Sequence, residues 1–271
     1  MVLRQGRRRD QTGSVPSGAH GATNKEHHVY WTQVAAQNWV LSAVSLRPAS
    51  STPPPTTTIA FDAVSSSATG NTTNTISWSH NIGNGTNRFL AVCTQARDTV
   101  AGDVAVTGVT ANGFPLTKVR ADLRTNGGTS LGTELWYLPN PGIGAYTITA
   151  TWAGALSSYG VGSATSYFGV DPAAPIDAHA GSGGTATALA TAITTVAPHA
   201  LITDCAIGQA NPMTIGTGQT TRVNRLTTGT ADSVGVSTMN DKAVAGTETM
   251  DWTQVAAQNW VLSAVSLRPA P

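Results

Sequence analysis

The sequence predicts an all-β protein: a two-sheet antiparallel sandwich of the jelly-roll type with an irregular N-terminal extension. Only 11% of the 271 residues are charged, while 40% are hydrophobic. Glu and Lys, which favour helices, occur three times each, and this argues against helical bundles and coiled coils. Short apolar stretches with alternating polar residues are separated by turn residues such as Asn84-Gly85 and Asn112-Gly113, a spacing typical of β-sandwiches.

Each expected strand is supported by alternation between two faces or by an apolar run between turn residues. In residues 74–80, Ile76 and Trp78 share one face, which predicts that both lie in the core. In chain order, the expected strands are 57–63, 74–80, 88–96, 104–111, 116–120, 133–138, 145–152, 160–170, 186–196, 200–208, 220–226, 233–239 and 260–267.

An exact internal repeat indicates the domain organisation. Residues 31–49 and 252–270 share the same nineteen letters, WTQVAAQNWVLSAVSLRPA. The offset of 221 residues is the size of a whole domain rather than of a solenoid unit. We therefore expect residues 31–49 to be the last strand of a preceding repeat, residues 50–58 a Pro/Thr linker, and residues 59–271 the complete sandwich. Because identical strands can be exchanged, residues 31–49 also suggest a strand-swapped oligomer.

Charge is divided unevenly along the chain. Residues 1–50 carry a net charge of +4 and residues 51–271 a net charge of −3, so the body is not expected to bind nucleic acid. The basic cluster Arg4–Arg9 lies in residues 1–30, which we expect to be an irregular, solvated tail; a phosphate-binding arm is the alternative. No apolar run is long enough to span a membrane, and no apolar signal core follows Met1.

The order of several segments resembles a known repeat. The segments IAFDAVSSSATGN, ISWSH, NRFLAVC, VTGVTANGFPLTKV, ELWYLPNPGIGAYTITATW, SYFGVDPAAPIDA and WVLSAVSLRPA carry the likeness. They resemble a loosely defined tandem β-sandwich repeat of large secreted or surface proteins of bacteria and of some phage structural proteins. The resemblance implies an extracellular, cell-surface or phage-particle location and assigns no catalytic residue.

Catalytic candidates are few. No G-x-S-x-G nucleophile motif is present, although His80 or His179 could serve a triad. Glycoside hydrolysis needs two nearby carboxyl groups, and Glu134 and Glu248 are the only glutamates of the body. We expect Glu134 to be a solvent-facing strand residue.

Metal and cysteine chemistry give two further expectations. Asp98 with Asp103, or Asp171 with Asp177, could hold a structural calcium ion, although neither pair has the spacing of a calcium loop; no other cofactor is expected. Cys93 and Cys205 lie within expected strands, where a disulfide is natural in an oxidising compartment. The sequence slightly favours two buried thiols instead.

Aromatic residues suggest where a ligand would bind. Trp152, Tyr159 and Trp252 fall near strand ends beside polar loops, and such rings could stack on sugars. The sequence thus favours a non-catalytic module for adhesion, surface display or particle architecture, with a glycan or a second copy as partner. The alternative is a carbohydrate-active or ester hydrolase on a jelly-roll scaffold.

Overall fold

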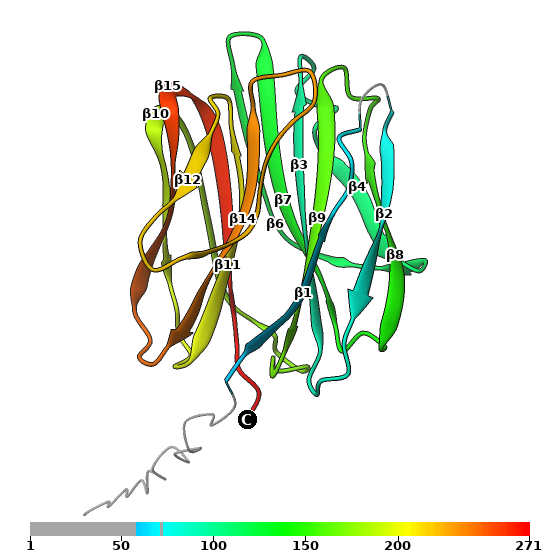
Figure 1. Cartoon of the computed structure of the whole chain (residues 1–271), viewed down its shortest axis with the longest axis vertical. Coiled ribbons are helices and arrows are strands. Elements are labelled where there is room, and N and C mark those ends of the chain that lie inside the picture. Colours follow the sequence, from blue (N-terminus) through cyan, green and yellow to red (C-terminus); the bar gives the residue numbers. More distant parts are fainter. Residues whose placement is uncertain (1–57, 71–72) are drawn as a thin grey trace, which may run out of the picture. The chain divides into compact units, whose positions relative to one another are not determined.

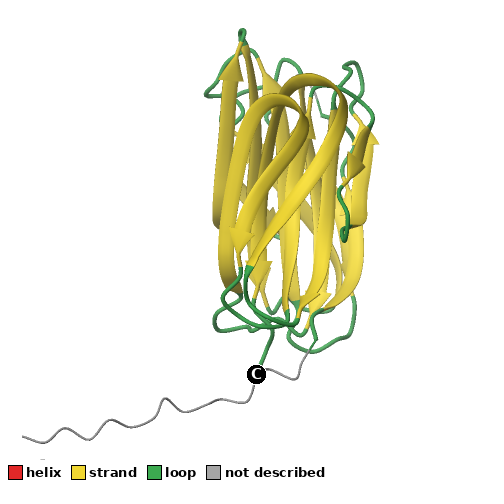
Figure 2. Ribbon diagram, turned by 90° about the vertical axis from the view of Figure 1, so that its left-hand side faces the viewer, coloured by secondary structure: helices red, strands yellow, loops and turns green. Residues whose placement is uncertain are grey.

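The computed structural model describes residues 58–70 and 73–271. These residues form fifteen β-strands and no helix (Figures 1 and 2), so the described part has no helix that could cross a membrane. The strands are β1 Ala60–Ser66, β2 Thr75–Ile82, β3 Phe89–Asp98, β4 Val106–Ala111, β5 Phe114–Pro115, β6 Thr117–Asn126, β7 Thr129–Pro139, β8 Gly144–Trp152, β9 Tyr159–Phe168, β10 Ile176–Thr194, β11 Ala200–Gly208, β12 Met213–Ile215, β13 Thr220–Leu226, β14 Ser233–Lys242 and β15 Thr247–Leu267.

The strands build three antiparallel sheets. A central sheet has the order β1-β9-β3-β7-β6, a small sheet the order β2-β8-β4-β5, and a C-terminal sheet the order β10-β15-β11-β14-β13, with β12 paired to β15. Figure 1 shows the central sheet between the other two. The predicted antiparallel β-sandwich is therefore confirmed, but the expected number of two sheets is wrong.

The central sheet is buried on both faces. In β3, Leu90 and Val92 belong to the core shared with the small sheet, whereas Phe89 and Cys93 belong to the core shared with the C-terminal sheet. Successive side chains of a strand point to opposite faces, so a continuous apolar run such as FLAVC fits a strand covered on both sides.

The C-terminal sheet carries a folded arm, made of residues 188–194 of β10 and 247–253 of β15. The register of the β10–β15 pair shifts between Ala186 and Ala188, and the two strands bend back there. Ser182 donates to Thr191 of the same strand over 3.1 Å, which places the two halves of β10 in adjacent layers. The arm covers the outer face of β11 and β15 with an apolar cluster that includes Leu189, Met250 and Trp252.

Along the chain, the first nine strands pass repeatedly between the central and small sheets, with the β4–β5 and β6–β7 hairpins each staying within one sheet. A jelly roll over all of residues 59–271 is not established, because the third sheet lies outside this alternation. The chain divides after Ser51 into two units. The predicted tail 1–30, repeat remnant 31–49 and all but the last residue of the linker 50–58 lie outside the described residues.

Candidate functional site

A polar cleft of about 590 Å³ lies at one end of the sandwich. Five segments meet there: the end of β3, the β6–β7 turn, the end of β11, the β13–β14 turn and the bend of β15. The lining residues are Arg97, Asn126, Gly127, Thr129, Gln209, Gly229, Thr230, Ala231, Asp232, Gln258 and Asn259. The cleft lies at the end opposite to Ala60, since β9 pairs with Arg97 at its first residue and with Ala60 at its last.

The floor of the cleft is an ion pair between Arg97 and Asp232, supported from below by the buried side chain of Tyr159. Nη1 of Arg97 lies 3.0 and 2.9 Å from the two carboxylate oxygens of Asp232, and the Tyr159 hydroxyl donates to Asp232 over 2.9 Å. Burial, and then the Asp232 charge, raise the pKa of Tyr159 well above its usual value, so the phenol keeps its proton. No described residue accepts a hydrogen bond from Nε or Nη2 of Arg97.

Side-chain amides form the rim. Oδ1 of Asn259 accepts hydrogen bonds from Asn126 (2.9 Å) and Thr185 (2.8 Å). Within the described part of the chain, Nδ2 of Asn259 and the side-chain amides of Gln209 and Gln258 have no hydrogen-bond partner, whereas the main-chain amide of Gln209 donates to the carbonyl of Asn259 over 3.0 Å. An amide both donates and accepts, so the rim offers both functions without a net charge.

Turn chemistry in the sequence explains the shape of the rim. Gly127 and Gly128 have φ angles of 58° and 73°, as a two-residue type I′ hairpin turn requires of both central residues. Asn126-Gly127-Gly128 is recognisable as a turn from sequence. Nothing in the sequence indicates that this turn meets the other four segments.

The aromatic candidates do not form a ligand surface. Trp152, Tyr159 and Trp252 are 1%, 0% and 0% exposed, so the prediction that they stack on a sugar is wrong for this structure. Trp152 packs in the core beneath the small sheet, and Trp252 is covered by the folded arm to which it belongs. Tyr159 contributes indirectly, by supporting Asp232 below the cleft.

His80 lies in a buried polar chain. Its Nδ1 is 2.9 Å from Oγ of Ser65, its Nε2 is 3.0 Å from Oγ of Ser166, and Ser166 donates to Asp62 over 2.7 Å. Burial lowers the pKa of His80 to about 4, against the opposing effect of the Asp62 charge. A hydrolase triad has its carboxylate directly on the imidazole, whereas Ser166 lies between them here. His179 is exposed on β10, in another sheet.

The two body glutamates are not brought together. Glu134 is 3% exposed; it accepts from the Val106 amide over 2.8 Å and pairs with Lys118 over 2.8 Å. The expectation of a solvent-facing Glu134 is therefore wrong, because its strand is covered by a sheet on both faces. Glu248 pairs with Lys242 over 2.9 Å on the folded arm, in a different sheet.

The four aspartates proposed as calcium ligands do not form a metal site in the structure. Asp98 accepts from Val100 N over 2.9 Å and from both the amide and hydroxyl of Ser157. Burial would raise its pKa, but these hydrogen bonds prevail and lower it. The described residues contain no group of three or more His, Cys, Asp or Glu side chains able to hold a metal ion.

Asp171 and Asp177, the second pair proposed for calcium, also accept hydrogen bonds from main-chain N–H groups. Asp177 accepts from the amides following β10 over 2.8 and 2.9 Å, while Asp171 caps the turn that follows it over 2.9 Å. No site for the calcium ion is built from these two residues. Asp103 likewise belongs to no such ligand group within the described ranges.

One buried carboxylate was not predicted. Asp204 is 0% exposed and accepts from the amide (2.5 Å) and hydroxyl (2.9 Å) of Ser237 and from Nε1 of Trp252 (2.7 Å). Burial raises its pKa to about 7, although the hydrogen bonds oppose the shift. In a two-sheet sandwich this face of β11 would meet solvent; the folded arm covers it.

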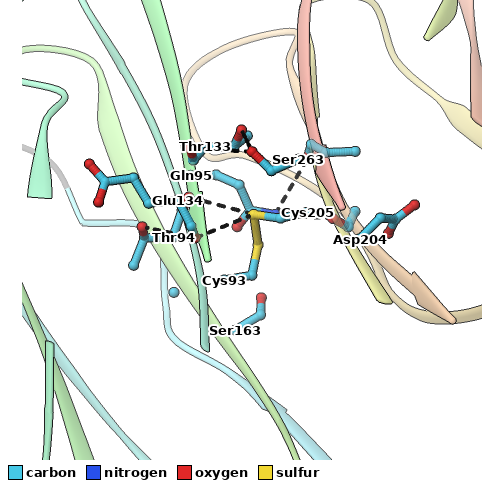
Figure 3. The surroundings of a disulfide bond; sticks show 12 residues. Cys93, Thr94, Gln95, Thr133, Glu134, Ser163, Asp204, Cys205 and Ser263 are labelled. Atoms are coloured by element: carbon cyan, nitrogen blue, oxygen red, sulfur yellow. Dashed lines mark hydrogen bonds between the residues drawn. A yellow bond between two sulfur atoms is a disulfide. The ribbon is translucent and has the colours of Figure 1, made fainter. Parts of the chain in front are cut away.

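A disulfide joins Cys93 of β3 to Cys205 of β11, with 5.6 Å between the Cα atoms (Figure 3). The slight preference for two free thiols is therefore wrong. The two cysteines lie on the facing surfaces of the central and C-terminal sheets, so the bond crosses the core between them.

Comparison of the chain with protein-family models, curated proteins and solved structures finds no match. The resemblance to a tandem β-sandwich repeat consequently stays a prediction.

Proposed function

We propose that the protein is a non-catalytic β-sandwich module of a secreted, cell-surface or phage-particle protein, acting in adhesion, display or architecture, and that it binds a glycan in the polar cleft. One observation carries the proposal: side-chain amides surround the supported Arg97–Asp232 pair, and those of Gln209 and Gln258 have no hydrogen-bond partner among the described residues. Sugar hydroxyls both donate and accept hydrogen bonds, as do amides. The Arg97–Asp232 pair at the floor is held in place by Tyr159 before a ligand arrives, which reduces the entropic cost of binding.

Two further features fit this proposal. A core disulfide is typical of proteins that fold in an oxidising compartment. Among the described residues, no aromatic side chain lines the cleft, so stacking would contribute little. We expect weak binding per module, which a tandem array would strengthen through multivalency.

A glycan array followed by NMR titration tests the proposal. Gln209→Ala and Gln258→Ala each remove a rim amide that supports no other described side chain. Each lost hydrogen bond of about 0.5–1.5 kcal/mol should weaken binding roughly 2- to 10-fold. Asn81→Ala on the exposed face of β2 is the matched control. Absence of any glycan ligand, or equal binding by parent and rim variants, would refute the proposal.

A hydrolase is the second candidate because the buried imidazole of His80 contacts the hydroxyl of the half-buried Ser65. Nδ1 of His80 lies 2.9 Å from Oγ of Ser65, the hydrogen-bond distance that a general base requires. Turnover of an ester or glycoside substrate that Ser65→Ala abolishes, with the fold intact, would favour it over the binding module.

A further inference from the structure

We propose that residues 31–49 can occupy, within the same chain, the place in the C-terminal sheet that residues 252–270 fill. The proposal concerns assembly of the fold and does not depend on glycan binding. It follows from the position of β15, from the sequence identity of the two segments and from the geometry of the chain ends.

The place itself is central to the domain. Each of the eight residues Trp260–Leu267 is paired on one side with β11, and the same stretch is paired on the other side with β10. Its side chains enter three apolar clusters: Val265 faces the central sheet, Leu262 faces the folded arm, and Val261 lies below the cleft. An empty place would expose two strand edges and all three clusters, so some segment must fill it.

Residues 31–49 have every side chain that this place requires. They match residues 252–270 letter for letter, so each ladder hydrogen bond and apolar contact available to one segment is available to the other. Leu41 corresponds to Leu262, and Ser42 corresponds to Ser263. The ladder positions and core contacts thus do not distinguish the two segments; only the connection to the rest of the chain does.

The connection is possible because the end of β15 lies beside the start of β1. The amide of Ala270 donates to Gly169 over 2.8 Å, and Ala60 pairs with Phe168 of the same stretch. Two strand spacings and one residue step place the Cα atoms of Ala270 and Ala60 no more than about 15 Å apart. Residues 50–58 could span roughly 30 Å when extended, so Ala49 could stand where Ala270 stands and still reach Ile59.

Charge substitutions in the full chain test this exchange. Leu262 is 0% exposed, and a buried unpaired carboxylate there is strongly unfavourable. We expect Leu41→Asp alone to leave the urea midpoint unchanged. Leu262→Asp should keep a cooperative unfolding transition because residues 31–49 take over, whereas Leu41→Asp with Leu262→Asp should lose it.

A cross-link identifies the segment in place. Oγ of Thr133 lies 2.7 Å from Oγ of Ser263, so Thr133→Cys with Ser263→Cys should form a disulfide in the parent chain. In the Leu262→Asp chain, Thr133→Cys with Ser42→Cys should form the equivalent bond, detected by peptide mass spectrometry in a monomer.

Three results would overturn the proposal. The first is a Leu262→Asp chain as unfolded as the double variant, and the second is a double variant that still folds. The third is rescue that depends on protein concentration and yields dimers, which would assign the place to a second copy.

Discussion

Breaking the bond between Cys93 and Cys205 should lower the free energy of unfolding by about 5 kcal/mol. The two residues are 112 positions apart, and in the chain-entropy model a loop of that length restricts the unfolded chain by about 16 cal/mol/K, or about 5 kcal/mol at 25 °C. Both side chains are buried between the central and C-terminal sheets, so the native contacts around them do not replace the lost link.

Urea denaturation of the parent, the two single Cys→Ala variants and the double variant measures this loss. Because the bond needs both cysteines, each single variant should lose nearly as much stability as the double, a non-additivity typical of coupled sites. Reductant should bring the parent close to the variants and leave the double variant unchanged. Single losses that simply add, or a parent insensitive to reductant after unfolding, would refute the reasoning.

Two further predictions concern the interior. The pKa of Asp204 is raised to about 7 from a usual 3.8, so its contribution to stability is present below pH ~4 and is lost as the pH rises to about 7. His80, with a lowered pKa, contributes in the opposite direction. Urea midpoints across this pH range should therefore fall more steeply with pH in the parent than in Asp204→Asn; parallel curves would contradict the assignment. Gly162→Ala should cost about 1–3 kcal/mol by overpacking, because the new Cβ would lie 2.3 Å from the Trp78 ring, whereas Gly108→Ala meets nothing within 4 Å; equal melting temperatures would contradict this packing.

Local sequence patterns were sufficient to predict the strands that are flanked by clear turn residues. The bounds expected for β11 and β13 agree with the structure to the residue, and Ile76 and Trp78 lie in the core as their alternation indicates. The first half of β10 was missed because Gly181 and its glycine neighbours carry no strand pattern. A side chain at Gly181 would lie 2.1 Å from the Asp122 carboxylate of β6, so a long-range contact explains that glycine.

The cleft could be predicted only in part. Its hairpin turn at Gly127 and Gly128 is visible in the sequence, but the ion pair between Arg97 and Asp232 joins residues 135 positions apart. The tryptophans looked accessible because strand ends in a two-sheet sandwich border loops. The third sheet and the folded arm bury Trp252, and no local pattern indicates that they exist.

Three acidic side chains of the described residues have a common role, and it bears on the proposed function. Glu134 accepts the amide of Val106 where β4 begins, Asp177 accepts two amides where β10 ends, and Asp204 accepts the amide of Ser237. Buried N–H groups without a partner are costly, and a carboxylate satisfies several of them at once. Because these carboxylates already serve the fold, the polar cleft is left with neutral amides and one internally paired arginine. If the cleft binds a glycan as proposed, its neutral amides predict an affinity that depends little on ionic strength.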